Sequence, residues 1–82
     1  MMDAAARLAS WSAEGGEGEA VRIDRLHRRV LGRAATSAEI ARGRRYLAEV
    51  ARETAAASDP AGRAWRSYAQ VLIASNEFLY LD

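Results

Sequence analysis

Apolar side chains recur along this chain at intervals of three and four residues, which is the spacing of one face of an α-helix. The clearest case is the stripe formed by Ile23, Leu26 and Val30. No stretch alternates strictly between apolar and polar residues, as a half-buried strand would. The pattern predicts helices over residues 4–13, 19–31, 37–57 and 60–79. We therefore expect an all-α fold, a small bundle of three to four helices.

The connection between the second and third helices carries both a stop signal and a start signal. Gly32 follows the last apolar residue, and glycine readily adopts the positive φ with which many helices end. Thr36 and Glu39 have the spacing of a capping box, in which each side chain accepts a hydrogen bond from the other residue's backbone N–H. The sequence thus predicts a helix-turn-helix connection from Gly32 to Thr36. Asp59 and Pro60 predict the start of the last helix, because aspartate is preferred at the N-cap and proline at the first helical position.

Residues 1–19 are predicted to stand apart from the rest of the chain. Leu8 and Trp11 lie on one face of a helix of about ten residues, which is too short to be stable unless it docks. The glycine- and glutamate-rich run after that helix is typical of a flexible linker. We expect a short, mobile helix and linker over residues 1–19 and a helical domain over residues 20–82, in which Gly43 permits a close contact between helices.

The composition limits both the size and the chemistry of the protein. Eighty-two residues make one small domain with a modest core, since nearly half of the hydrophobic residues are alanines. With no cysteine, the chain can form no disulfide, no thiolate metal site and no attached c-type haem. No apolar run approaches the roughly 18 residues that a membrane span needs. We predict no cofactor.

Two places in the sequence could carry chemistry. His27 is the only histidine, and no cysteine or pair of carboxylates stands near it to complete a zinc site or a triad. Asn76 and Glu77 could form a polar pair in a site, or Asn76 could hydrogen-bond between helices while Glu77 faces solvent. We favour the structural roles, predict no catalytic and no metal-binding residue, and do not favour an enzymatic role for this chain by itself.

A basic flank on the second and third helices raises the alternative of nucleic-acid binding. All twelve basic residues are arginines, and eight of them lie at positions 22, 25, 28, 29, 33, 42, 44 and 45. The net charge is only +1, however, and eleven acidic residues dilute the field that phosphate binding requires. We expect a solvated arginine face, with a small nucleic-acid-binding domain as the alternative.

The last predicted helix and the residues after it are unusually apolar. They supply a candidate contact face: Trp65, Tyr68, Leu72, Asn76, Phe78, Leu79 and Tyr80. Aromatic residues at helical spacing also form cores, so this face belongs either in the middle of the bundle or against a partner. The apolar tail is denser than an isolated terminus needs, which indicates that it docks on this domain or on something outside the chain.

Residues 23–82 combine several motifs with a known arrangement. These are LHRRVLGR at 26–33, the turn Thr36 to Glu39, Ala64-Trp65, and the closing run QVLIASNEFLYLD at 70–82. Together they resemble the C-terminal end of a planctomycete-type bacterial family catalogued as domain of unknown function 1553. Ala35 departs from that family, which usually has proline there, and the change is expected to loosen the turn without altering its cap.

The resemblance implies a limited set of properties. Such proteins are typically large and exported, with a neighbouring domain of unknown function and often a cytochrome-c-like domain bearing CxxCH, which this chain lacks. The family's activity is unassigned, so no catalytic residue carries over. We expect a structural or protein-interaction C-terminal module of a larger exported or cell-surface bacterial protein, with the remainder of that parent or another protein as its partner. A fragment of a cell-surface enzyme whose catalytic residues lie outside this chain is a further alternative.

Overall fold

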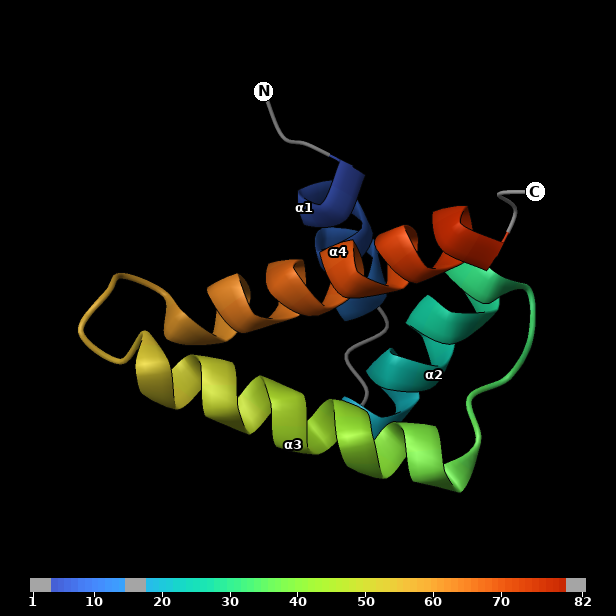
Figure 1. Cartoon of the computed structure of the whole chain (residues 1–82). Coiled ribbons are helices and arrows are strands. Elements are labelled where there is room, and N and C mark those ends of the chain that lie inside the picture. The colour runs from blue at the N-terminus through green and yellow to red at the C-terminus, as the bar shows by residue number, and fades with distance from the viewer. Residues whose placement is uncertain (1–3, 15–17, 80–82) are drawn as a thin grey trace.

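The computed structural model describes residues 4–14 and 18–79, and within them the protein is all-α (Figure 1). Its helices are α1 (Ala4–Ala13), α2 (Glu19–Leu31), α3 (Ser37–Glu53) and α4 (Pro60–Leu79). The prediction of a small all-α bundle is confirmed. The first, second and fourth helices have the bounds that the pattern of apolar residues predicts, and only α3 differs.

The longest helix, α4, packs against each of the other three. Figure 1 shows α3 running beside α4, with α1 crossing α4 steeply. The core draws side chains from all four helices: Ala9, Ile23, Leu26, Leu47, Ala64, Trp65, Tyr68 and Leu72. Of the two places predicted for the apolar last helix, the middle of the bundle is therefore the one that the structure confirms.

The predicted helix ends are made by the residues that the sequence indicates. Gly32 ends α2 in the left-handed conformation, with φ at 74°. Thr36 and Glu39 form both hydrogen bonds of the capping box of α3, at 3.1 and 2.9 Å. Asp59 accepts a hydrogen bond at 3.1 Å from the backbone N–H three residues later, and Pro60 is the first residue of α4. These contacts fix where three helices begin and end.

The third helix is shorter than its sequence predicts. We expected it to continue to about Ala57, but α3 ends at Glu53. The Thr54 hydroxyl donates to the Val50 carbonyl at 2.8 Å, and the chain then turns, with the Ala57 N–H donating to the Thr54 carbonyl. No side chain larger than alanine packs on the core between residues 51 and 58. Helix propensity alone does not hold a segment that buries no apolar side chain.

The first helix docks through small side chains. Its buried residues are Ala5, Ala9 and Ser12, whereas Leu8 and Trp11 are only half-buried. The face predicted from Leu8 and Trp11 is therefore not the fully buried one. Small side chains on the inner face let the backbone of α1 lie close to α4, since the distance between helix axes depends on the side chains at the contact.

The predicted division of the chain at residue 19 does not separate two folded parts. Ala9 belongs to the same hydrophobic cluster as Ile23, so α1 docks on the core of the other helices. Gly18 is the N-cap of α2, and Glu19 already lies in that helix. The rest of the predicted linker, residues 15–17, lies outside the described residues.

The predicted close contact at Gly43 is confirmed. A Cβ atom at this position would lie 2.7 Å from Oη of Tyr68 and 3.1 Å from Cδ1 of Ile23. Both distances are shorter than ordinary van der Waals contact. The missing side chain therefore lets the Tyr68 ring of α4 lie directly against the backbone of α3.

Candidate functional site

A cluster of polar residues lies where α2 leads into α3, around the buried His27. This side chain is 3% exposed and lies on the inner face of α2. Its Nε2 atom lies 2.8 Å from Oη of Tyr68, which comes from α4. Burial raises the pKa of Tyr68 to about 12, so the phenol keeps its proton. The contact joins two residues that are 41 positions apart in the sequence.

The second ring nitrogen of His27 faces a carboxylate without bonding to it. Nδ1 is buried, has no hydrogen-bond partner among the described residues, and lies 4.0 Å from Oε2 of Glu39. A proton on Nδ1 points a donor toward that negative charge and leaves Nε2 to accept from the Tyr68 hydroxyl, so we assign this tautomer. Burial lowers the pKa of His27, although the nearby Glu39 acts in the opposite direction. The imidazole is therefore neutral at pH 7.

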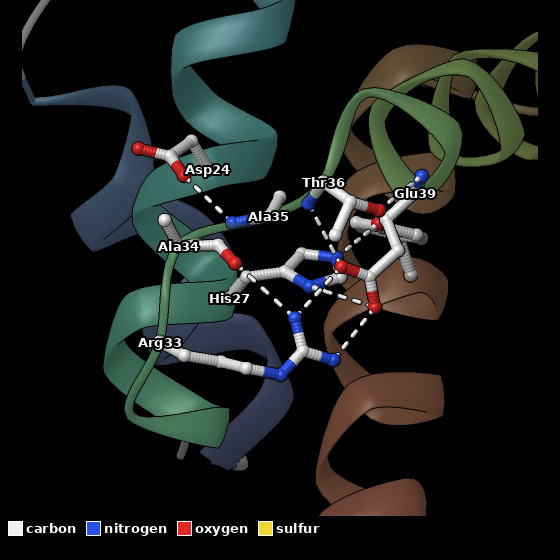
Figure 2. A network of polar contacts seen from close by, with 8 residues as sticks. Asp24, His27, Arg33, Ala34, Ala35, Thr36 and Glu39 are labelled. Atoms are coloured by element: carbon white, nitrogen blue, oxygen red, sulfur yellow. Dashed lines mark hydrogen bonds and ion pairs between the residues drawn. The ribbon is translucent and has the colours of Figure 1, made fainter.

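Glu39 is held in place by two other residues of the connection (Figure 2). Both of its oxygens accept from the Arg33 guanidinium at 2.8 Å, and Oε1 also accepts from the Thr36 N–H at 2.9 Å. The hydrogen bonds from Arg33 and Thr36 hold the pKa of Glu39 far below its usual range. A carboxylate that is fully ionised and already bonded on both oxygens is a poor proton donor or acceptor.

Asp24 fastens the turn from the side of α2. Its Oδ2 accepts from Nε of Arg28 at 2.7 Å, and the two residues form an i, i+4 pair on α2. Its Oδ1 accepts from the Ala35 N–H at 2.9 Å, a contact that no pattern in the sequence predicts. These bonds, from Arg28 first and Ala35 second, lower the pKa of Asp24. The Ala35 N–H, which proline would lack, thus ties the turn to α2, and the expected loosening relative to proline stays a prediction.

A pocket of about 560 Å³ lies beside this cluster, between the end of α2 and the second half of α4. We call it the α2–α4 pocket; its lining residues are His27, Leu31, Arg33, Glu39, Val71, Leu72, Ala74 and Ser75. Val71 is 44% exposed, which makes it one of the most exposed large apolar side chains described. The walls of the pocket are mainly apolar, with charged groups at one side.

The polar residues of the cluster are hydrogen-bonded mainly to one another and to the backbone of the turn. Ser75 lines the same pocket as His27, but no hydrogen bond joins them, and Nε2 of His27 is occupied by Tyr68. A serine nucleophile requires a base within hydrogen-bond reach. No three acidic, histidine or cysteine side chains in the described ranges come together as a metal site.

The predicted contact face on α4 is divided between the core and the surface. Trp65, Tyr68 and Leu72 are at most 8% exposed, so they pack mainly within this domain. Asn76 is half-buried. The side chains of Glu77, Phe78 and Leu79, with all of Tyr80, lie outside what the structure describes. Sequence periodicity indicated an apolar face, but which part stays open depends on how the helices pack.

The arginines of the basic flank are largely engaged within the chain. The Arg22 guanidinium lies 3.8 Å from the centre of the Trp65 ring, and Arg25 lies 4.6 Å from that of Trp11. Arg44 pairs with Glu19 at 3.2 Å. The pairing with Glu19 occupies a donor and offsets a charge that a phosphate backbone would need, which does not favour nucleic-acid binding.

No protein-family model matches the chain, and no curated protein and no solved structure is significantly similar to it. The resemblance of residues 23–82 to domain of unknown function 1553 thus stays a prediction. Within the part that the structure describes, no helix is both long enough and apolar enough to cross a membrane.

Proposed function

We propose that this chain is a structural or protein-interaction module of a larger exported bacterial protein, and that the rest of that protein covers the α2–α4 pocket. The observation that carries the proposal is the apolar pocket wall around Val71, which stands open on the central helix of the bundle. Exposed apolar surface that is contiguous, and not scattered, is typical of a contact site.

The chemistry of the site supports a binding role over a catalytic one. Glu39, Asp24 and the Nε2 atom of His27 are all bonded to other groups of the helix connection or of α4. They hold the pocket in shape and leave Leu31 and Val71 as the groups that a partner would contact. We infer the parent protein from the resemblance of residues 23–82 to domain of unknown function 1553. That resemblance rests on the turn motif and on the closing run of the sequence.

The proposal is tested by the size of the native product and by what lies against Val71. An antibody raised against residues 36–81 should detect a species much heavier than 8.9 kDa in the exported fraction of cells that make the protein. A photo-crosslinking residue in place of Val71 should then link to peptides outside residues 1–82. The matched control is the same residue in place of Glu49, which is exposed on α3, and it should give few such links.

Three results would contradict this function. A product of about 8.9 kDa in the cytoplasm would show that no larger parent exists. Equal crosslinking from Val71 and Glu49 would show that the pocket is not the contact surface. If the recovered partner were a nucleic acid, the proposal would be replaced by the alternative of a nucleic-acid-binding domain, which the arginines suggest.

A further inference from the structure

A second groove, of about 450 Å³, lies between α1 and the first half of α4. It shares no residue with the α2–α4 pocket, so a ligand in it is independent of the proposed function. Three arginines line it: Arg22 from α2, and Arg63 and Arg66 from α4. Among the described residues, Asp59 is the one acidic residue in its wall. The lining therefore carries a formal charge of +2, counted as three guanidinium groups less one carboxylate.

Arg22 is held rigidly in this groove by neutral groups. Its guanidinium stacks on the Trp65 ring at 3.8 Å, and its Nη2 donates to the Ala9 carbonyl at 3.2 Å. Nε lies 3.4 Å from the Ser12 hydroxyl. No carboxylate among the described residues is hydrogen-bonded to Arg22, and its partial burial lowers its pKa. Glu19 attracts this cation without a hydrogen bond to it, so an anion in the groove would be the first negatively charged group bonded directly to the guanidinium.

Arg63 and Arg66 are exposed and have donors to spare. Nε of Arg63 donates to the Ser58 carbonyl at 3.0 Å, which orients the side chain and leaves its terminal nitrogens unused within the described chain. No hydrogen bond or ion pair joins Arg66 to any residue that the structure describes. Asp59, the acidic residue nearby, is already bonded as the N-cap of α4. Arg63 and Arg66 therefore line the groove with donors that are unused within the described chain, and the Asp59 carboxylate lines the same groove without bonding them.

We propose that the groove between α1 and α4 binds the phosphate group of a small phosphate monoester. A monoester carries a charge of about −1.5 to −2 at neutral pH, which matches the +2 of the lining, whereas a single carboxylate supplies only half of it. Arginine forks bond phosphate oxygens in pairs. The alanines of α1 and the Trp65 edge offer an apolar surface for the organic part of the ligand, and the volume lies within the range of small-molecule sites.

Binding is tested by titrating the isotope-labelled chain with inorganic phosphate and with phenyl phosphate at constant ionic strength. Saturable NMR shifts are expected at the Ala9 amide and the Trp65 indole, and phenyl phosphate should bind more tightly because its ring contacts the apolar wall. Arg63→Gln and Arg66→Gln should each weaken binding about tenfold, the usual loss for one charge-assisted hydrogen bond. Both residues are exposed, so neither variant endangers the fold. The matched control is Arg45→Gln, an exposed arginine of α3, which should bind as the parent does.

Four results would overturn phosphate binding in this groove. Absence of saturable shifts at millimolar phosphate would exclude the site. If Arg45→Gln weakened phosphate binding as much as Arg63→Gln and Arg66→Gln do, binding would depend on the overall charge of the protein and not on this groove. Nucleic-acid binding would depend on charge in the same general way. Benzoate binding as tightly as phenyl phosphate would replace phosphate with a carboxylate as the ligand group. Sulfate binding as tightly as phosphate would show an adventitious ion only.

Discussion

At the scale of single residues, the absence of a side chain at Gly43 lets Tyr68 take its position. The Tyr68 ring lies against the backbone of α3, and its hydroxyl reaches Nε2 of His27 on α2. One tyrosine thereby joins three helices. Nε2 of the buried His27 would be left without a partner if Tyr68 moved away, so Gly43 indirectly keeps this nitrogen bonded.

We expect Gly43→Ala to destabilise the protein. The new Cβ would lie 2.7 Å from Oη and 3.0 Å from Cζ of Tyr68, which forces the ring to move. The loss should be about 1–3 kcal/mol, partly offset by about 1 kcal/mol from the better helix propensity of alanine. Urea unfolding followed by circular dichroism measures the free energy of unfolding.

The matched background for this test is Tyr68→Phe, which removes the oxygen that the new methyl meets. Gly43→Ala should cost less in that background than in the parent chain, so that the double-mutant cycle gives a coupling energy. Equal costs in both backgrounds would show that the two residues are not in the close contact described.

At the scale of elements, the connection from α2 to α3 is held by three separate devices. Gly32 reverses the chain at the end of α2, and the capping box of Thr36 and Glu39 starts α3. Between them, Asp24 of α2 accepts from the N–H of Ala35 in the turn. The first two devices are local in sequence, and the third spans 11 residues. Only the third ties the turn back onto the body of a helix.

Replacing Asp24 by alanine should therefore loosen the connection. The Ala35 N–H would lose its part-buried acceptor, at an expected cost of about 1–2 kcal/mol. Arg28→Ala is the matched control, because it removes only the exposed i, i+4 pair, worth about 0.3–0.5 kcal/mol. Hydrogen exchange at the Ala35 amide should become faster in Asp24→Ala and stay unchanged in Arg28→Ala. Similar exchange rates in the two variants would contradict a role of Asp24 in the turn.

At the scale of the whole molecule, His27, Asp24 and Glu39 all make the free energy of unfolding depend on pH in the same direction. Burial places the pKa of His27 below its ordinary value of 6.5, so the unfolded chain takes up this proton first. Hydrogen bonds lower the pKa values of Asp24 and Glu39 below 3.8 and 4.5, so their contribution is complete above these values. It is lost as the pH falls through the pKa values of the folded state. All three groups therefore destabilise the fold toward acid.

The free energy of unfolding should accordingly fall from about pH 6.5 downward and more steeply below about pH 4.5. Urea titrations at a series of pH values measure this profile. Glu39→Gln should reduce the fall below pH 4.5, which belongs to that carboxylate, and enlarge the fall from pH 6.5, because the Glu39 charge no longer raises the pKa of His27. A parent chain that becomes more stable on acidification from pH 6.5 would contradict the burial of neutral His27.

The sequence by itself determined the local features of this protein. Glycine at the end of α2, the capping box at Thr36 and Glu39, and Asp59 before Pro60 act within a few residues, so their consequences can be derived from spacing and backbone chemistry. The period of the apolar residues likewise determined the helices. The exception is the alanine-rich segment after α3, which adds no residue to the hydrophobic core and forms a turn in place of helix.

Only the tertiary structure decided which side chains meet. The pairing of His27 with Tyr68 spans 41 positions, the bond from Ala35 to Asp24 spans 11, and Ala9 docks α1 on the core of the other helices. Such contacts depend on how helices cross and on which faces they bury, and periodicity does not specify a partner. The same packing closed Tyr68 and Leu72 into the core and left Val71 open, which is why the exposed surface could not be derived from the sequence.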